Sequence, residues 1–462
     1  MGELLNIVEK CQISAPANSV GERSLALTFY DLRWLLYKHP VHQLFLYDFH
    51  HSRSHFVETV IPNLKQSLST TLEHFFLFAS NLIVHTNPTS KKPEFRHVEG
   101  DSLMLTFAES DNLDFNYLKG DHPRECDKFH PLVPLIEGAT KVSDFVKMPV
   151  CSIQVTLFPN SGVTIGITNN HALCDARSKY AFLMAWTSIA KYGTIGLLPS
   201  YDRVIICPNS LDDMLLKLPQ IKTIDNTPEL VDLSNKVRAT FVLTRANINW
   251  LKKWLLVQLP TLEYVSSFVV GCAYVWTCIA KSQVLVEGKN GEYEVERFSC
   301  SMDWRSRLDP PVPQTYFGNC VWPTGAQTQT TILTGDRGFP TAVKLLEKAI
   351  RESNKGMFED AEILLEKTFL PIPTIGVAGT PKLNVYNVDF GWGKPKKYEV
   401  ISLDYYDSVS VNVSKDSPEE LEIGLRLPPK QMDAFLTISR NELESILSDS
   451  SSDPSPTNVQ CP

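Results

Sequence analysis

His171 and Asp175, four residues apart, are the side chains of this sequence whose types and spacing most readily do chemistry. The sequence has eleven histidines, and the other ten lie between His39 and His130, so no imidazole follows His171. A neutral imidazole can take a proton from a hydroxyl and return it to a leaving group near neutral pH. His171 is therefore the one histidine of the middle and second half that could act as a general base. A structural histidine is the alternative, and the residue types alone leave both open.

The residues around His171 predict a junction between a strand and a helix. Residues 162–168 alternate apolar β-branched residues with small ones, which indicates a buried strand, and residues 178–186 have helical spacing. Such a junction often presents a reactive group at a cleft. Cys174 is an alternative nucleophile at this position, because an imidazole can activate a nearby thiol.

Two further motifs follow downstream. Residues 316–320 read Tyr-Phe-Gly-Asn-Cys, and residues 389–393 read Asp-Phe-Gly-Trp-Gly. In the second motif Gly391 and Gly393 flank Trp392, which allows the backbone to turn sharply and to approach another surface closely. Taken alone, this motif indicates a tight loop held by one aromatic side chain.

The three motifs, in this order and in a chain of this length, resemble the plant BAHD acyltransferase family. The His-x-x-x-Asp motif, from His171 to Asp175, and Asp-Phe-Gly-Trp-Gly are shared by the family as a whole. Tyr-Phe-Gly-Asn-Cys resembles its anthocyanin and flavonoid glycoside branch, which holds malonyltransferases and hydroxycinnamoyltransferases. The similarity extends from residues 8–11 to residues 431–435.

The resemblance implies a two-domain α/β fold like that of chloramphenicol acetyltransferase, with a channel between the domains. We expect an N-terminal domain over residues 1–197 and a C-terminal domain over residues 236–447. Residues 198–235 contain four prolines and form the expected crossover linker. Residues 448–462, rich in Ser, Asp and Pro, are expected to be disordered. By resemblance, acyl-CoA enters the channel from one face and the acceptor from the other.

The resemblance also implies roles for the motif residues. His171 is the general base for transfer of an acyl group from CoA to a hydroxyl, with no covalent nucleophile. Asp175 could orient the imidazole as in a triad, but in the family this aspartate pairs with an arginine, for which Arg305 is the match. Asp389 is structural, and the indole N–H of Trp392 is a candidate donor to the oxyanion.

The donor can be argued from charge, because a malonyl carboxylate in a dehydrated channel needs an arginine. Arg426 lies in the alternating segment 421–427 and is the first candidate, with Arg177 the second; a surface ion pair with Glu422 is the alternative role for Arg426. Segments 259–282 and 379–397 resemble malonyltransferases. Malonyl-CoA is therefore the expected donor, with hydroxycinnamoyl-CoA and acetyl-CoA as alternatives.

The expected acceptor is a hydroxyl of a plant specialised metabolite, a flavonoid or anthocyanin glycoside, with an alkaloid alcohol as the alternative. Trp322 and Pro323 stand where relatives carry small residues and could reshape the acceptor pocket. Ser266 and Ser267, at the start of an expected buried helix, are candidates for binding CoA. An acyl-CoA-binding protein on the same fold is the non-enzymatic alternative.

Composition bounds the remaining functions. A net charge of −8 and a pI near 5.8 give no support for nucleic-acid binding and disfavour an anionic membrane surface. We expect no signal peptide, no myristoylation site and no apolar stretch long enough to cross a bilayer. Ten cysteines without a Cys-x-x-Cys pair are typical of a cytoplasmic protein, here expected to be a monomer. His50, His51 and His55 lack carboxylate or thiolate partners, so no metal site is expected.

Overall fold

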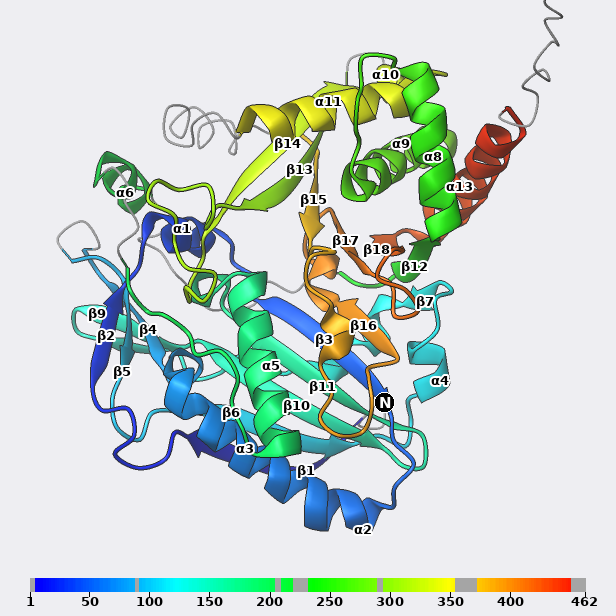
Figure 1. The fold of residues 1–462 in the computed structure, drawn as a ribbon. Coiled ribbons are helices and arrows are strands. Elements are labelled where there is room, and N and C mark those ends of the chain that lie inside the picture. The colour runs from blue at the N-terminus through cyan, green and yellow to red at the C-terminus, as the bar shows by residue number, and fades with distance from the viewer. Residues whose placement is uncertain are drawn as a thin grey trace, which may run out of the picture.

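The computed structural model describes residues 5–87, 91–203, 209–218, 232–288, 294–353 and 372–449. These residues form three β-sheets with helices packed against them, in a two-domain α/β arrangement (Figure 1). The sheet of the N-terminal half has six strands in the order β1-β6-β10-β11-β3-β16. Their bounds are β1 Asn6–Ser14, β6 Ser102–Glu109, β10 Cys151–Phe158, β11 Gly162–Asn169, β3 Val41–Asp48 and β16 Lys397–Val400.

The two central strands of this sheet, β10 and β11, are buried along their whole length. Their β-branched and small residues suit a sheet covered on both faces. Helix α3, Ile61–His74, packs with α5, Ala176–Tyr192 (Figure 1). Between the two helices, the indole N–H of Trp186 donates to Ser67 Oγ at 3.1 Å. The strand expected over residues 162–168 and the helix expected over residues 178–186 are both confirmed.

The sheet of the C-terminal half has seven strands in the order β14-β13-β15-β17-β18-β12-β7. Their bounds are β14 Val321–Gln329, β13 Val295–Asp303, β15 Thr374–Ala378, β17 Ser408–Val413, β18 Leu421–Leu427, β12 Val237–Leu243 and β7 Arg124–Glu125. The longer helices of this half are α8 Arg245–Gln258, α9 Ser267–Glu287, α11 Gly338–Glu352 and α13 Pro429–Asp449. Helix α9 contacts all three of the others and forms the centre of a second hydrophobic core.

By length and composition α9 is apolar enough to cross a membrane, which corrects the expectation that no segment is. Of its most apolar window, 72% is buried inside the protein. Helix α9 is apolar on all sides because it is a core helix, and α8, α11 and α13 pack around it.

The remaining elements frame these two sheets. A five-stranded sheet in the order β2-β5-β4-β9-β8 comprises β2 Arg23–Ala26, β5 Glu94–His97, β4 Asn81–His85, β9 Phe145–Pro149 and β8 Thr140–Val142. The short helices are α1 Phe29–Leu32, η1 Arg33–Leu36, α2 Arg53–His55, η2 Phe56–Val60, η3 Phe76–Ala79, α4 Phe115–Leu118, η4 Cys126–Lys128, η5 His130–Leu132, η6 His171–Leu173, α6 Asn209–Leu216, α10 Thr330–Thr334, η8 Val385–Asn387 and η9 Ile401–Asp404.

Each half gives one strand to the other half's sheet. Strand β16, late in the chain, pairs with β3 of the six-stranded sheet, and β7, early in the chain, pairs with β12 of the seven-stranded sheet (Figure 1). The expected domain boundaries at residues 197 and 236 stay a prediction about which parts of the chain fold as units. As a division of sheets it is incomplete, because residues 397–400 lie with the first half and residues 124–125 with the second.

A buried ionic cluster lies where the halves cross. Arg238 Nη2 contacts Asp404 Oδ1 at 3.0 Å, and Arg238 Nη1 contacts Glu399 Oε2 at 3.3 Å. Arg124 Nη2 reaches Glu399 Oε1 at 2.8 Å, and His130 Nε2 reaches Asp404 Oδ2 at 2.8 Å. Burial alone would raise the pKa of Glu399, but its arginine partners hold it below its usual value.

The expected linker and tail lie partly outside the described residues. Ser200 forms a bridge with Tyr316, and Leu211 and Leu215 of α6 join the core of the first half. Residues 204–208 and 219–231 of the expected linker are not described. Helix α13 extends to Asp449, and the rest of the expected disordered tail lies outside the described residues.

Candidate active site

A cavity of about 560 Å³ lies between the two halves and contains His171 in its wall. This volume is within the range of small-molecule sites. Both halves contribute to its lining, which includes Arg33, Trp34, Tyr37, His171, Cys174, Asp175, Arg177, Lys179, Ser266, Asp303, Arg305, Arg307, Pro323, Lys382, Leu383 and Tyr406.

His171 lies two residues after the end of β11 and begins the short helix η6. Asn170 caps that helix, because its Oδ1 accepts a hydrogen bond from Ala172 N at 2.9 Å. The Asn319 side chain holds the same turn from the other half: its Nδ2 donates to the carbonyls of His171 and Ala172, each at 3.0 Å. Trp34 stacks on the imidazole with ring centroids 3.5 Å apart and an interplanar angle of 5°. The ring of His171 is thus fixed in the cavity wall.

The surroundings of His171 keep its imidazole neutral. Burial lowers its pKa to about 3, with smaller contributions in the same direction from Lys179 and Arg33. The Nδ1 atom is buried without a hydrogen-bond partner among the described residues, which leaves Nε2 to meet a substrate. A neutral imidazole with an available nitrogen can accept a proton from a hydroxyl in the cavity.

Asp175 is not the partner of the imidazole. It caps helix α5, where its Oδ1 accepts from Ser178 N at 3.0 Å. Its carboxylate forms a two-pronged pair with Arg305, at 2.7 Å from Nη1 to Oδ2 and 3.1 Å from Nη2 to Oδ1. Oδ2 also accepts from Cys320 N at 3.0 Å. The structure therefore brings Asp175 and Arg305 together and gives the triad arrangement no support.

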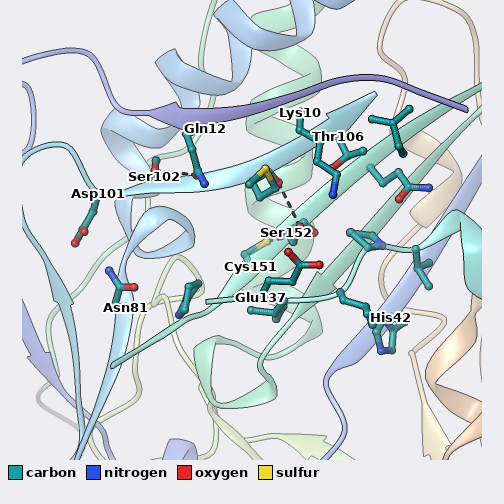
Figure 2. Close-up of a pocket in the computed structure, with 18 of the residues that line it drawn as sticks. Lys10, Gln12, His42, Asn81, Asp101, Ser102, Thr106, Glu137, Cys151 and Ser152 are labelled. Carbon is teal, nitrogen blue, oxygen red and sulfur yellow. Dashed lines mark hydrogen bonds between the residues drawn. The ribbon is translucent and has the colours of Figure 1, made fainter. Parts of the chain in front are cut away.

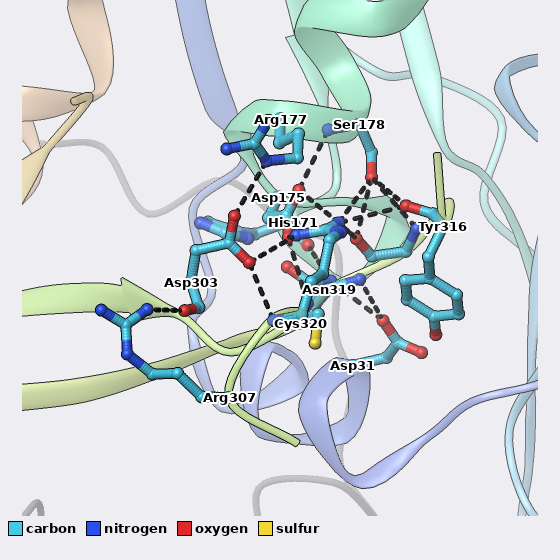
Figure 3. A network of polar contacts seen from close by, with 12 residues as sticks. Asp31, His171, Asp175, Arg177, Ser178, Asp303, Arg307, Tyr316, Asn319 and Cys320 are labelled. Carbon is cyan, nitrogen blue, oxygen red and sulfur yellow. Dashed lines mark hydrogen bonds and ion pairs between the residues drawn. The ribbon is translucent and has the colours of Figure 1, made fainter. Parts of the chain in front are cut away.

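Arg305 connects the Tyr-Phe-Gly-Asn-Cys segment to this pair. Figure 3 shows Tyr316, Asn319 and Cys320 of that segment gathered around Asp175 and Ser178. Its Nη2 donates to the carbonyls of Tyr316 and Gly318, both at 3.2 Å, and to Ser178 Oγ at 3.1 Å. Gly318 has φ +142, a conformation that favours glycine. These contacts hold the segment against the start of α5 and place Asn319 beside the carbonyl of His171.

Cys174 is unsuited to act as a nucleophile. The thiol is buried, and burial raises its pKa far above its usual value despite the nearby Lys179. A thiol that cannot ionise near neutral pH is a poor nucleophile. The structure gives the nucleophile alternative no support.

The Asp-Phe-Gly-Trp-Gly segment forms a closed turn. Asp389 Oδ1 accepts from Gly391 N at 2.8 Å and Gly393 N at 2.9 Å, and both glycines have positive φ. Lys191 of α5 donates to Asp389 Oδ2 at 2.7 Å. Burial would raise the pKa of Asp389, but these hydrogen bonds lower it. The turn thus joins the C-terminal half to the C-terminal end of α5.

Trp392 lies away from the reaction cavity, which corrects its assignment as an oxyanion donor. Its ring meets Tyr47 edge-on at 5.7 Å and Phe49 at 5.6 Å, and it stacks with Phe390 at 5.6 Å. It is not among the residues that line the cavity around His171. The described contacts of Trp392 are those of a packing residue.

The two arginines expected to hold a donor carboxylate have different surroundings. Arg426 donates from Nη2 to the carbonyls of Leu403 and Asp404, at 3.4 Å and 3.1 Å, and does not line the cavity. Glu422, the surface partner considered for Arg426, is instead buried, and its Oε1 accepts a hydrogen bond from the Tyr386 hydroxyl at 2.7 Å. Arg177 does line the cavity, but its Nε is paired with Asp303 Oδ2 at 2.8 Å. The prediction that Arg426 binds the carboxylate of the acyl donor is therefore wrong, and Arg177 stays a candidate.

The two serines proposed to bind CoA also differ. Ser266 caps α9, accepting from Val269 N at 3.2 Å, and lines the cavity. Ser267 accepts a hydrogen bond from Lys252 at 3.0 Å and is not among the lining residues. Only Ser266 of the two therefore lies where a ligand of this cavity could meet it.

A second cavity, of about 640 Å³, is lined by residues of the six- and five-stranded sheets and by the segment around residue 135 (Figure 2). Its histidines, His42 and His130, are both engaged: His42 Nδ1 lies 2.8 Å from Thr168 Oγ1, and His130 pairs with Asp404. Its lining does not include His171. Within the described residues, no three His, Cys, Asp or Glu side chains are placed to hold a metal ion.

Comparison with known proteins agrees with this geometry. Residues 5–440 match the family model described as the transferase family. The chain is 49% identical over 455 residues, 96% of this chain and 98% of the relative, to a malonyl-coenzyme A:anthocyanin 3-O-glucoside-6''-O-malonyltransferase of Dahlia pinnata. It is 38% identical to phenolic glucoside malonyltransferase 1 of Nicotiana tabacum, covering 88% of this chain and 92% of that protein. The chain belongs to the BAHD acyltransferase family.

The fold is similar to that of a solved enzyme structure. The crystal structure of vinorine synthase matches with a TM-score of 0.68 and 19% sequence identity, covering 93% of this chain and 96% of that chain. At this identity the likeness concerns the fold alone. This BAHD acyltransferase is an acyl-CoA-dependent O-acyltransferase, and the cavity between its halves holds the family's His-x-x-x-Asp motif.

Four residues at the site of this BAHD acyltransferase escaped the sequence analysis. Arg33, Trp34, Lys179 and Asn319 all touch His171 or line its cavity. Asn319 was visible inside the Tyr-Phe-Gly-Asn-Cys motif, but its contact with His171 spans the two halves. Lys179 lies on the buried side of an amphipathic helix, where a charged residue is itself a signal of a special role.

Proposed function

We propose that this chain transfers a malonyl group from malonyl-CoA to a sugar hydroxyl of an anthocyanin or related flavonoid glucoside, with His171 as general base. The observation that carries this proposal is the 49% identity, over nearly the whole chain, to the Dahlia pinnata relative, whose name states that donor and acceptor. The neutral imidazole in a cavity between the halves supports it.

The geometry supports direct transfer without a covalent enzyme intermediate. His171 takes the proton of the acceptor hydroxyl while that oxygen bonds to the thioester carbonyl carbon. The tetrahedral intermediate then collapses as the carbon–sulfur bond breaks, and the imidazolium returns the proton to the CoA sulfur. The products are the malonyl ester and free CoA, and His171 is again neutral.

We propose that Ser266, at the N-terminus of α9, faces a phosphate of CoA. The positive end of a 21-residue helix favours an anion there. Lys252, which donates a hydrogen bond to Ser267, adds a positive charge beside this helix end. Ser266→Asp should raise the KM for malonyl-CoA several-fold, because it places a negative charge at that helix end. An unchanged KM would remove Ser266 from the CoA site.

The purified chain tests the proposal directly. Incubation with malonyl-, acetyl- and coumaroyl-CoA and an anthocyanin 3-O-glucoside should release free thiol fastest with malonyl-CoA and yield a product heavier by one malonyl group. Faster transfer from coumaroyl- or acetyl-CoA would replace malonyl as the donor. Binding of CoA esters without thiol release would favour an acyl-CoA-binding protein.

We further propose that the enzyme is a cytoplasmic monomer. The eight cysteines within the described residues are all free thiols, as is usual in a reducing compartment. Light scattering on the purified protein should give the mass of one chain, and a fluorescent fusion in plant cells should be distributed through the cytosol. A dimer mass or an organellar signal would contradict these two statements.

A further inference from the structure

Four side chains form a continuous stack that ends on the imidazole of His171. The Trp34 indole lies flat on the imidazole, with ring centroids 3.5 Å apart. The Arg33 guanidinium lies over the Trp34 ring at 4.8 Å and over the Trp322 ring at 5.2 Å. Trp322 in turn stacks on Phe29, with centroids 4.8 Å apart. The stack thus joins η1, which holds Arg33 and Trp34, to β14 of the other half.

Trp322 meets the stack and not the reaction cavity. Its side chain is 2% exposed and is not among the residues that line the cavity, whereas the next residue, Pro323, does line it. At the other end of the stack, Tyr37 forms a hydrogen bond with Arg33 and lies against the Trp34 ring at 5.3 Å. The Trp34 indole is therefore held in place from several sides.

Packing alone does not explain the residue types of this stack. Trp34 Nε1, Trp322 Nε1 and Arg33 Nη1 are buried and have no hydrogen-bond partner in the described part of the chain. A buried donor without a partner lowers the stability of the fold. Phenylalanine or leucine could fill the two indole positions without that cost. What these side chains share is a flat surface, and the last such surface lies on His171.

The ring of His171 lacks the hydrogen bond that usually orients a catalytic imidazole. A carboxylate or carbonyl on the second ring nitrogen commonly sets its orientation. Here Nδ1 has no hydrogen-bond partner among the described residues, and the carboxylate of Asp175 binds Arg305. The second side-chain torsion of histidine is broad, so the ring does not fix its own plane. The flat contact with Trp34 is the side-chain contact that does so.

We propose that Trp34 is a positioning residue for the catalytic base, and that Arg33 and Trp322 act on the base through it. This inference rests on the proposed function, because it takes His171 as the general base. With the plane of the imidazole fixed, Nε2 stays directed at the acceptor hydroxyl during proton transfer. Since the imidazole covers one face of the indole, the guanidinium on the other face draws on the same π electrons. The stack therefore orients the ring more than it stabilises its positive charge.

The first experiment measures kcat and KM for malonyl-CoA, with one glucoside acceptor, in matched variants. Trp34→Leu removes the flat surface and should lower kcat by about 10- to 100-fold with little change in KM, the loss expected when a reacting group is misplaced by about 1 Å. Trp34→Phe keeps a flat surface and should retain most of the wild-type kcat. Trp250→Leu, which removes an exposed tryptophan on α8, is the control and should match the wild type. If Trp34→Leu does not fold, Trp34→Met takes its place with the same expected result, because its flexible chain fills the space without a flat surface.

A double-mutant cycle with His171→Ala shows whether Trp34 acts through the base. The residual rate of His171→Ala is measured with enzyme in excess over malonyl-CoA. If Trp34 only orients the imidazole, Trp34→Leu should not lower this residual rate further. An equal fall in both backgrounds would show that Trp34 contacts the substrate itself and would overturn the positioning role.

The far end of the stack is tested through Arg33. Arg33→Met removes the guanidinium and keeps an unbranched side chain, so kcat should fall several-fold in the wild-type background and not at all in the Trp34→Leu background. The melting temperature should stay near that of the wild type, because Arg33 has no carboxylate partner in the described part of the chain. A lowered melting temperature with an unchanged kcat would make Arg33 a structural residue and would refute its action on the base.

The outcomes distinguish this inference from the proposed function. A His171→Ala variant with a normal kcat refutes His171 as the base, and with it the proposed function. A nearly inactive His171→Ala variant, together with a normal kcat in Trp34→Leu, refutes the inference alone. Equal losses of kcat in Trp34→Phe and Trp34→Leu would show that a flat surface is not what the base needs, and would also refute it.

Discussion

The imidazole of His171 is held through its backbone and its ring face rather than by a carboxylate. Asn319 from the C-terminal half donates to the carbonyls of His171 and Ala172, and Trp34 covers the ring. Asn319 itself is held by Asp31, whose Oδ1 accepts from Asn319 N at 3.0 Å. The base is therefore placed only when the two halves are joined.

Replacing Asn319 tests this placement. Asn319→Leu has a similar size but no donor for the two carbonyls, so we expect kcat to fall at least tenfold with little change in the KM for malonyl-CoA. The free energy of unfolding should fall by about 1–3 kcal/mol, because buried acceptors lose their partner. A variant with normal kcat and lowered stability would show that Asn319 only holds the fold together.

Sequence reasoning at this scale found the residues of the motifs and missed those that only the fold brings together. His171, Asp175 and Arg305 carried recognisable spacing and context. Arg33 and Lys179 belong to no such pattern, and only the folded structure shows that they line the cavity around His171. Arg426 failed as a prediction because strand alternation identifies a shared face but not what covers that face.

At the scale of elements, helix α5 and strand β13 are joined through one buried pair. Asp175 caps α5, and Arg305, just after β13, binds its carboxylate and the carbonyls of Tyr316 and Gly318. A buried ion pair of this geometry leaves an uncompensated charge when one partner is removed. His171 stands four residues before Asp175, the cap of this helix.

Asp175→Ala and Arg305→Ala should therefore each lower the free energy of unfolding by about 3–5 kcal/mol, the usual cost of breaking a buried pair. The double variant should lose less than the sum, because the second substitution removes the charge that the first left unpaired. Chemical denaturation of the three variants measures this. Additive losses would show that the two side chains do not act as a pair. Lost activity with unchanged stability in both single variants would indicate that Asp175 acts on the imidazole directly.

The exchange of strands β7 and β16 joins the two halves through the buried cluster around Arg238. Arg238→Met keeps the aliphatic stem but leaves Asp404 and Glu399 with fewer cationic partners. We expect a fall in melting temperature of several degrees and earlier loss of activity than of secondary structure on heating, because the cavity lies between the halves. Coincident loss of both signals would show that the cluster does not control the contact between halves.

Helices and strands with strong sequence patterns were predicted well, whereas the exchange of β7 and β16 between the halves was not predicted. Periodicity identified β11, α5 and α9, because a buried strand or helix imposes its period on the sequence. Strands β7 and β16 comprise two and four residues, which are too few to show alternation. Their pairing partners are far along the chain, which no local pattern records.

At the scale of the molecule, two histidines with lowered pKa values make stability depend on pH. Burial lowers the pKa values of His42 and His171 to about 3, whereas the unfolded value is near 6.5. Below pH 6.5 the unfolded chain binds these protons and the folded chain does not, so stability falls with falling pH until about pH 3. Each histidine contributes up to about 1.4 kcal/mol per pH unit over this window.

Denaturation between pH 7 and pH 4.5 measures this dependence. His42→Gln should reduce the slope of unfolding free energy against pH by about one proton relative to the wild type. The carboxyls with lowered pKa values, Asp303, Asp404 and Glu399, add their loss of stability at lower pH. A His42→Gln slope equal to that of the wild type would show that His42 is protonated in the folded state.

The most direct measurement is the rate of malonyl transfer from malonyl-CoA to an anthocyanin 3-O-glucoside by the wild type and by His171→Ala, with malonyl-CoA binding measured on both by calorimetry. Loss of the general base should lower kcat by about 10²- to 10⁴-fold while the Kd for malonyl-CoA stays within a few-fold of the wild type. A His171→Ala variant that binds malonyl-CoA normally and keeps more than about a tenth of the wild-type kcat would contradict the account.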